Sequence, residues 1–317
     1  MVRVRFLVRR LLMLVASLFV ASFLIFASMY VAPGNPVAAL TGGRSISPEA
    51  LHALEHRYHL DQPFLVQYWE WLKAALHGDL GTSIQLHEDV SRIIAERAWI
   101  TLSLVLYASI LIVVIGIGLG LLAGIRPGWM DTSVLVISSL AAAIPAFVAA
   151  IVLTLFFSVS LGWFPSLGTG SGFLDNVWHL TLPAIALAVS SIAIVARVTR
   201  AAIREEAGKE HVQTAVSRGI PRQLVLTRHV LRNAAIPITT ITGITIASLI
   251  AISSVVETAF GLNGLGEILV RASEGKDLAV VQGISLLLVA AFVVVNLVVD
   301  VLYAMLDPRV SLGARAE

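Results

Sequence analysis

The sequence has no cysteine and few charged residues. The absence of cysteine excludes disulfide scaffolds, thiolate metal sites and cysteine nucleophiles. Only 13% of the 317 residues are charged, which is about half the share that a soluble globular domain carries. The sequence also lacks a Gly-x-x-x-x-Gly-Lys-Ser/Thr phosphate loop, a nucleophile-elbow serine and a His-Glu-x-x-His motif. Hydrolysis of ATP by a phosphate loop is therefore excluded for this chain.

Apolar residues make up 57% of the sequence, and the mean hydropathy is +0.89. They are concentrated in runs long enough to cross a hydrocarbon core of about 30 Å. The first run, Leu11 to Val31, exceeds the roughly 7–15 residues of a signal-peptide core, and we interpret it as a permanent span. The sequence predicts an all-α polytopic membrane protein with six transmembrane helices. The other five are expected at 99–124, 132–158, 179–199, 236–257 and 280–306.

Three glycines, Gly116, Gly120 and Gly124, recur at every fourth position of the second predicted span. This spacing leaves one helix face without side chains, so another helix backbone can approach it closely. A nucleotide-binding role fails for these glycines, because no strand precedes them. We expect them to support close helix packing within the bundle.

Positive charges are distributed unevenly between the predicted loops. If the N-terminus is cytoplasmic, the cytoplasmic pieces hold 15 of the 22 lysines and arginines. This distribution agrees with the positive-inside rule and predicts that both termini are cytoplasmic. The formal net charge of only +2 gives no case for nucleic acid as a partner.

Residues 32–98 contain no run of membrane length and predict an extracytoplasmic insert after the first span. Two amphipathic helices are expected in it, one beginning after Ser47 and one from about Phe64 to Leu76. Three histidines on the first helix fall at helical spacing, which would suit neighbouring metal ligands. Solvated surface histidines are common, however, and we predict no metal site from His52, His56 and His59.

The connection at residues 200–235 is basic, helix-forming and far longer than two neighbouring spans need. A short amphipathic helix is predicted from about Lys209 to Arg218, because Gly219 and Pro221 follow it as stop residues. A second basic helix, from about Arg222 to Asn233, leads into the next span.

The short helix carries Val212 and Val216 at i, i+4, a small apolar patch that would fit a groove on a partner. Two interpretations are open on these residues alone. The helix either lies on lipid headgroups, or it docks in a partner's groove and transmits motion.

This connection resembles the EAA loop of binding-protein-dependent ABC importer permeases. Glutamine replaces the glutamate of the Glu-Ala-Ala-x-x-x-Gly core, and the later Leu-Pro of the general pattern is absent near Leu231. Both departures are similar to those in the dipeptide/oligopeptide/nickel family, and the connection resembles the loop of that family. The matching stretches are His211 to Gly219 and Arg228 to Ala234. The core residues are Gln213, Thr214, Ala215 and Gly219.

Seven further motifs similar to those of this family occur in order over nearly the whole chain. Each motif alone is weak evidence for the resemblance, but seven motifs in the same order are specific evidence for it. In the first of them Asn35 replaces the usual aspartate. They are Ala32–Pro36, Leu60–Pro63, Gly78–Gly81, Val256–Thr258, Gly264–Gly266, Val281–Gly283 and Leu306–Arg309.

The resemblance implies the B-type permease subunit of a heteromeric importer in the bacterial inner (plasma) membrane. A second homologous permease would complete the pore for di- or oligopeptides. Two ABC ATPase subunits would bind ATP and Mg, and an extracytoplasmic binding protein would deliver the substrate. This chain would bind no cofactor and would not be an enzyme.

The implied organisation is an N-terminus with the first span (1–31), an extracytoplasmic subdomain (32–98), a permease core (99–306) and a cytoplasmic tail (307–317). The core includes the coupling loop 200–235. Its coupling helix would sit in a groove on one ATPase. The implied coupling residues are Lys209, Glu210, His211, Val212, Gln213, Thr214, Ala215, Val216, Arg218 and Gly219.

Two acidic residues in predicted spans are candidates for a transport pathway or gate, since ionisable groups in lipid are costly. Glu257 lies at the outer end of the fifth span and could line the gate or bind a substrate amine. Asp300, in the last span, could instead pair with Arg9 or Arg10, and we favour that structural role.

Other functions remain as alternatives to a peptide importer. Within the family, the substrate could be nickel, glutathione or another small solute. An ion-coupled secondary transporter would predict inverted repeats and charged midplane residues, and such charges are absent here. A membrane enzyme would need catalytic motifs that this sequence lacks.

Overall fold

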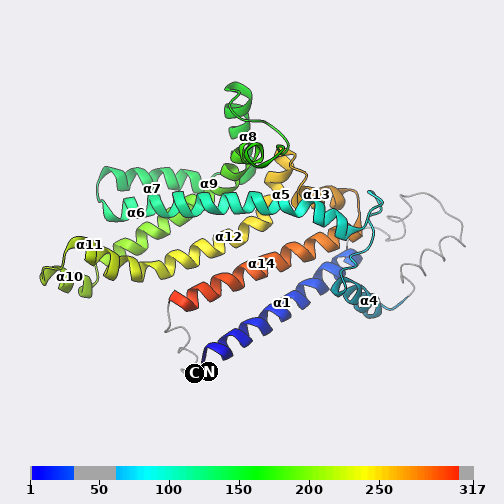
Figure 1. Cartoon of the computed structure of the whole chain (residues 1–317), viewed down its shortest axis with the longest axis horizontal. Coiled ribbons are helices and arrows are strands. Elements are labelled where there is room, and N and C mark those ends of the chain that lie inside the picture. Colours follow the sequence, from blue (N-terminus) through cyan, green and yellow to red (C-terminus); the bar gives the residue numbers. More distant parts are fainter. Residues whose placement is uncertain (1, 32–61, 307–317) are drawn as a thin grey trace, which may run out of the picture.

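The computed structural model describes residues 2–31 and 62–306 (Figure 1). The predicted helix after Ser47, with His52, His56 and His59, and the tail 307–317 lie outside the described residues. Within them, every regular element is helical, apart from one isolated bridge between Thr82 and Asp89. The elements are α1 (Val2–Val31), α4 (Phe64–Leu76), α5 (Val90–Leu111), η1 (Ile112–Ile117), α6 (Gly118–Ile125), α7 (Trp129–Ala142), α8 (Ala146–Leu153), η2 (Thr154–Ser160), α9 (Phe173–Ala207), α10 (Glu210–Ser217), α11 (Arg222–Leu224), η3 (Val225–Leu231), α12 (Arg232–Phe260), α13 (Leu265–Glu274) and α14 (Leu278–Leu306), where η marks π-helical segments.

Five helices are long and apolar enough to cross a membrane, and the number is six if the bent pair α7 and α8–η2 counts as one span. The predicted all-α polytopic architecture is confirmed. The second predicted insert helix is also confirmed, since α4 has the expected bounds.

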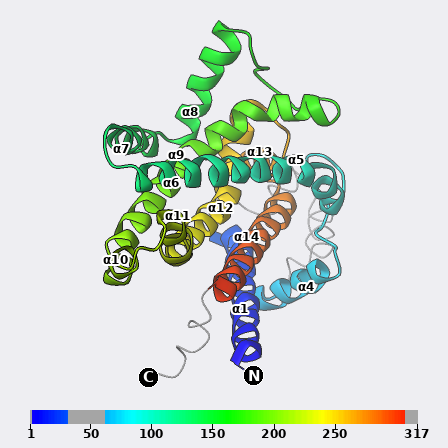
Figure 2. The ribbon, with the colours of Figure 1, turned by 60° about the vertical axis from the view of Figure 1, so that its left-hand side comes forward.

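The third predicted span, 132–158, is not one continuous helix. The chain bends by 101° between α7 and the α8–η2 pair, and α8 projects away from the bundle (Figure 2). Pro145 occupies the N-cap of α8 with an extended backbone, ψ 146°. Proline has no N–H to donate and disfavours helical geometry in the residue before it, so a break at this position has a local cause.

The second spanning helix begins earlier than hydropathy indicates. It starts at Val90, before the span predicted from residue 99. The added turns carry charged residues, and Arg92 pairs with Glu96 at 3.1 Å across one helical turn. Hydropathy marks the part of a helix that suits lipid, whereas the helix itself extends beyond that part.

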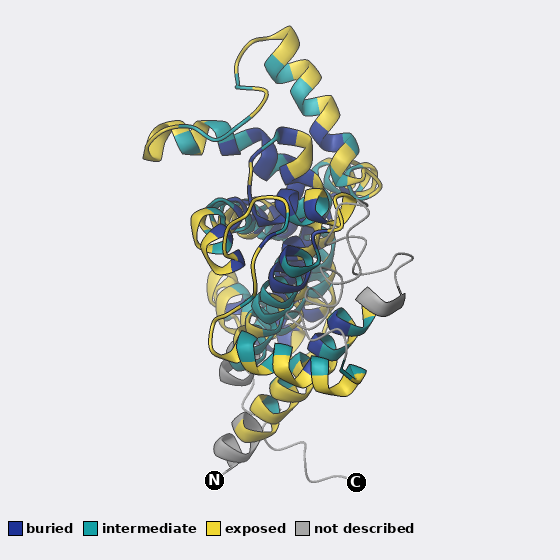
Figure 3. Ribbon diagram, turned by 90° about the vertical axis from the view of Figure 1, so that its right-hand side faces the viewer, coloured by how far each residue is buried: buried dark blue, intermediate teal, exposed yellow. Residues whose placement is uncertain are grey.

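Helix α9 lies at the centre of the bundle. In its most apolar stretch 61% of the residues are buried within the chain, against 11% for α1. Burial is therefore greatest in the middle of the bundle, while the outside of the bundle keeps exposed apolar faces (Figure 3). In a membrane, lipid would cover those faces.

The predicted close approach at the three glycines is confirmed. They line the face of η1 and α6 that packs on α9. A Cβ atom at Gly120 would lie 2.4 Å from Cβ of Thr199 and 2.6 Å from the carbonyl oxygen of Ala196. At Gly124 the nearest atom, Cβ of Ile203, would lie at 2.9 Å. At Gly120 and Gly124 only a residue without a Cβ permits this helix separation.

Helix α1 packs along α14 and also contacts α4, at the edge of the bundle (Figure 1). Ser22 shares a hydrogen bond of 2.9 Å with the hydroxyl of Tyr68 on α4. Arg10 forms an ion pair of 2.6 Å with Asp300 on α14. The structural partner that we favoured for Asp300 is therefore present.

Replacing Arg10 with glutamine is expected to lower the amount of protein in the membrane. Asp300 would then be an unpaired carboxylate in an apolar span. The cost would stay below about 3 kcal/mol, because Asp300 lies toward one end of its helix and 29% of its side chain is exposed. Immunoblots of membranes and the thermal unfolding midpoint in detergent would measure the loss. The double variant R10Q/D300N should recover most of it, and a double variant worse than R10Q would contradict the pairing.

Candidate functional site

Helix α10 stands at one end of the bundle, between the end of α9 and the start of α12 (Figure 1). Gly208 closes α9, and Lys209 then turns the chain with an extended backbone, φ −71° and ψ 148°. Arg218 is the C-cap residue. The short helix predicted from Lys209 to Arg218 is confirmed, with these two residues as its caps.

The C-terminal stop of α10 has the hydrogen bonds of a Schellman motif. The amide of Gly219 donates to the carbonyl of Val216 at 2.9 Å, and the amide of Ile220 donates to Ala215 at 3.3 Å. Gly219 has φ +74°, in the left-handed region that glycine adopts at low cost. The reversal that starts the second basic helix therefore depends on this glycine.

An apolar cluster holds α10 against the rest of the chain. Val212 and Ala215 on α10 are each 5% exposed and enter this cluster from one side. Val216, in contrast, is 60% exposed. We predicted that Val212 and Val216 together form a patch that faces a partner. This prediction is wrong for Val212, because its side chain packs against its own subunit. The cluster consists of Ile203, Val212, Ala215, Val225, Val230, Ala234 and Ile238.

Glu206, near the end of α9, joins three elements through one carboxylate and is only 5% exposed. Its Oε2 accepts a hydrogen bond from Nζ of Lys209 at 2.5 Å, and its Oε1 accepts from the amide of Asn233 on α12 at 2.7 Å. His211 on α10 lies 3.3 Å from Oε1. The hydrogen bond to Glu206 raises the pKa of Lys209, so the lysine stays charged. Glu206 thus fixes the start of α10 relative to α9 and α12.

The remaining surface of α10 is open. Gln213 donates from its side chain to the carbonyl of Gly208 at 3.1 Å, and this contact closes the entry turn. The other predicted coupling residues expose their side chains away from the apolar cluster. This exposed set is Glu210, Thr214, Val216 and Arg218.

A second charged cluster lies at the same end of the bundle. Asp131, at the start of α7, pairs with both Arg200 and Arg204 of α9, and Arg204 reaches its carboxylate at 2.9 Å. Arg204 also donates to the carbonyl of Ala123 on α6 at 3.2 Å. The cluster ties α6, α7 and α9 together at the end of the bundle that carries α10.

Glu257 lies at the opposite end of α12 and is fully buried. Its Oε2 accepts from the backbone amides of Gly266 at 2.8 Å and Glu267 at 3.2 Å, in the first turn of α13. A carboxylate at a helix N-terminus is favourable because it satisfies free amides and opposes the helix dipole. The gate or pathway role of Glu257 and Asp300 stays a prediction; here one carboxylate caps α13 and the other pairs with Arg10.

In the part of the chain that the structure describes, no group of three or more histidine, aspartate or glutamate side chains could hold a metal ion. The charged clusters above are ion pairs and hydrogen bonds between helices. They can set the positions of α9, α10 and α12 relative to one another.

Comparison with known proteins identifies the fold with a transporter family. The family model described as "Binding-protein-dependent transport system inner membrane component" matches residues 116–312, more than half of the chain. This chain belongs to that family. A second model, for the N-terminal part of such membrane components, matches residues 3–105 of this permease.

Relatives of this permease match it over almost their full length. A protein of Brucella abortus (strain 2308), provisionally named a peptide transport system permease protein, is 40% identical over 95% of this chain and 97% of its own length. The glutathione transport system permease protein GsiC of Escherichia coli (strain K12) is 34% identical over 96% of this chain and 98% of its own length. The chain is a permease subunit of an ABC importer.

The fold also has a counterpart among solved structures. A chain of the methionine ABC transporter MetNI, in an inward-facing conformation, superposes with a TM-score of 0.57 at 20% identity. The superposition covers 68% of this chain and 96% of that chain. The likeness supports the permease fold.

Sequence reasoning missed Glu206 and the Asp131 cluster. Glu206 had one local signal, since it stands three residues before Lys209, at a spacing that allows a helical ion pair. The sequence signal for Asp131 was weaker: it is the single acidic residue in a short predicted loop, 125–131. Their partners Asn233, Arg200 and Arg204 come from other helices, so only the folded chain brings them together.

Proposed function

We propose that this permease subunit forms, with a second homologous permease, the pathway for uptake of di- or oligopeptides. The relatives from Brucella, whose printed names refer to peptide transport, support a peptide substrate. Glutathione is the second candidate, because the GsiC relative is nearly as similar and glutathione is itself a small peptide. Nickel or another small solute remains the further alternative within the family.

In this proposal the end of the bundle that carries α10 is cytoplasmic, as are both termini, and the chain lies in the bacterial inner membrane. The excess of lysine and arginine in the loops at that end supports this orientation. Two partner ATPases bind ATP and Mg, and a binding protein delivers substrate on the opposite side. The chain itself hydrolyses nothing, in keeping with its lack of a phosphate loop.

Helix α10 is the coupling helix of the proposal. The single observation that carries this assignment is its attachment: one face is fixed to its own subunit by Val212, Ala215 and Glu206, while the other face is open. Closure of the ATPase dimer would push on the open face. Because Glu206 connects α10 to both α9 and α12, the push would reach two spanning helices directly.

The assembly is tested by purifying the tagged chain in a mild detergent and identifying the bound proteins by mass spectrometry. We expect a homologous permease and one or two phosphate-loop ATPases. Proteoliposomes of the recovered complex, supplied with its binding protein, should then import a labelled dipeptide when ATP is present. Preference for glutathione would select the second candidate. Recovery of the chain alone, transporting without ATP, would reject the importer function.

Replacing Gly219 with valine is expected to uncouple transport while the protein still inserts in the membrane. No atom lies within 4 Å of the position that Cβ would take, so steric crowding is absent. The left-handed backbone at this position costs a β-branched residue about 1–2 kcal/mol or more. This strain would loosen the end of α10. Transport and ATP hydrolysis are measured on the same proteoliposomes.

Gly208→Ala is the matched control, because Gly208 flanks the other end of α10 with φ −82° and leaves ordinary space for a methyl group. It should transport at the normal rate. Normal transport by G219V as well would contradict the role of this stop in coupling.

A further inference from the structure

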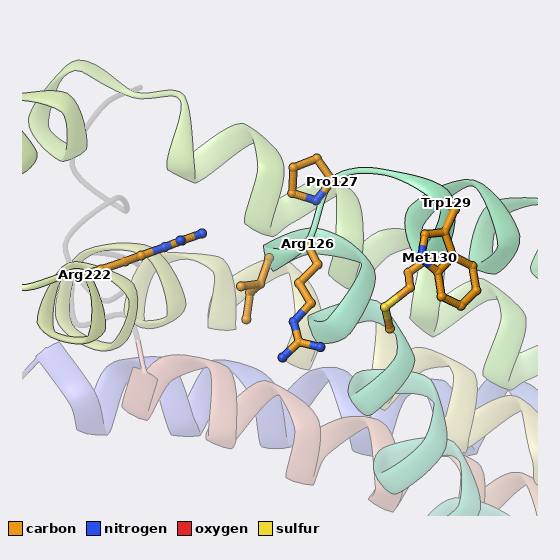
Figure 4. Close-up of a pocket in the computed structure, with 6 residues that line it drawn as sticks. Arg126, Pro127, Trp129, Met130 and Arg222 are labelled. Atoms are coloured by element: carbon orange, nitrogen blue, oxygen red, sulfur yellow. The ribbon is translucent and has the colours of Figure 1, made fainter.

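A basic hollow opens between the α6–α7 turn and α11, beside the coupling segment (Figure 4). Its volume is about 330 Å³. Arg222 reaches from α11 toward the turn that carries Arg126, so two guanidinium groups border one space. The lining residues include two cations and no acid: Ile125, Arg126, Pro127, Trp129, Met130 and Arg222.

Among the described residues, no acidic side chain pairs with the two arginines of the basic hollow, Arg126 and Arg222. The nearby carboxylate of Asp131 is already engaged by Arg200 and Arg204. The start of α7, a helix of 14 residues, also opens at this turn and adds the positive end of its dipole. The hollow is therefore suited to an anion.

An apolar path leads away from the hollow along α7. Trp129, Val136 and Leu140 share one face of this helix and are 79%, 54% and 67% exposed. The opposite face carries the buried Asp131 and Ser138. A tryptophan at the end of a spanning helix is typical of the level of lipid headgroups. The anion site thus continues into a surface that suits hydrocarbon.

We propose that the basic hollow binds the phosphate headgroup of an anionic phospholipid, with its acyl chains along the exposed face of α7. Arg126 and Arg222 hold the phosphate, and Trp129 lies beside the headgroup. The apolar path favours a lipid over free phosphate, which would use only the arginines. It also favours a lipid over a soluble protein, because Val136 and Leu140 lie on the exposed apolar face of α7, away from the end of the helix.

Native mass spectrometry of the purified chain tests the proposal. Phosphatidylglycerol and phosphatidylcholine are titrated separately, and bound lipid is counted per protein. The intact chain should retain phosphatidylglycerol selectively, and R126Q/R222Q should bind it roughly tenfold or more weakly, because each basic residue at the membrane surface contributes to anionic lipid affinity. The control K73Q/R92Q removes two exposed charges from α4 and α5 and should keep selectivity.

Two further arms separate the alternatives. Inorganic phosphate should not displace the lipid; displacement by phosphate at millimolar concentration from both the intact chain and W129A would show a simple anion site and overturn the lipid assignment. The proposal also fails if R126Q/R222Q binds phosphatidylglycerol normally. If that variant keeps its lipid but loses a co-purifying ATPase, the arginines contact protein instead.

Discussion

Replacing Glu206 with glutamine is expected to reduce ATP-driven transport by about tenfold while the chain still inserts and folds. Glutamine keeps the size of the side chain and can accept a hydrogen bond from Asn233. It removes the charge that holds Lys209 and contacts His211. Loss of one hydrogen bond to a charged group is enough for a change of this size.

The effect should appear as uncoupling rather than as misfolding. Val212 and Ala215 would still pack into the apolar cluster, so α10 would remain attached but would tilt about that contact. A push on its open face would then move α10 without moving α9 and α12 by the same amount. We therefore expect ATP hydrolysis to continue while the transported substrate per ATP falls. Both quantities are measured in proteoliposomes, and faster tryptic cleavage after Lys209 or Arg218 would report the loosened helix.

Glu205→Gln is the matched control, because Glu205 is the exposed neighbour on the same helix. It removes the same charge without touching the contacts of Glu206. E205Q should transport normally. If E206Q also keeps its transport ratio, or if both variants lose it equally, the carboxylate of Glu206 does not position α10.

Helix α10 was predictable from sequence because its boundaries depend on local chemistry. Gly219 and Pro221 specify the end of α10 whatever surrounds them, since one accepts a left-handed backbone and the other cannot continue a helix. The glycine spacing of the second span is equally local in its effect. It leaves a bare helix face, and only the identity of the partner, α9, had to come from the structure.

Other features depend on tertiary contacts, which periodicity does not report. Val212 and Val216 lie one turn apart and look equivalent in sequence, yet packing against Ile203 and Val225 buries only the first. The bend before α8 was missed for a different reason. Hydropathy remains high on both sides of Pro145, so the run has the composition of one span although the backbone turns by 101°.

Replacing Gly120 with valine is expected to abolish accumulation of the folded protein, and alanine should already reduce it strongly. A Cβ at this position would lie 2.4 Å from Cβ of Thr199 and 2.6 Å from the carbonyl oxygen of Ala196. Neither atom is the end of a flexible side chain, so α6 and α9 would have to separate. Overpacking in a well-packed interior costs about 1–3 kcal/mol and often more, and here it would disturb the central helix of the bundle.

The glycines of one helical stretch provide a graded series for this prediction. At Gly118 an added Cβ meets nothing within 4 Å, and at Gly116 it meets Val195 at 3.2 Å. Alanine at Gly118 should be neutral or slightly stabilising, because alanine favours a helix over glycine by about 1 kcal/mol. Alanine should cost little at Gly116 and most at Gly120. Thermal unfolding and membrane accumulation measure the order. Thr199→Ala should not rescue G120A, since the Cβ of residue 199 and the carbonyl of Ala196 both remain; a full rescue, or an unaffected G120A, would mean that the helices are not packed this closely.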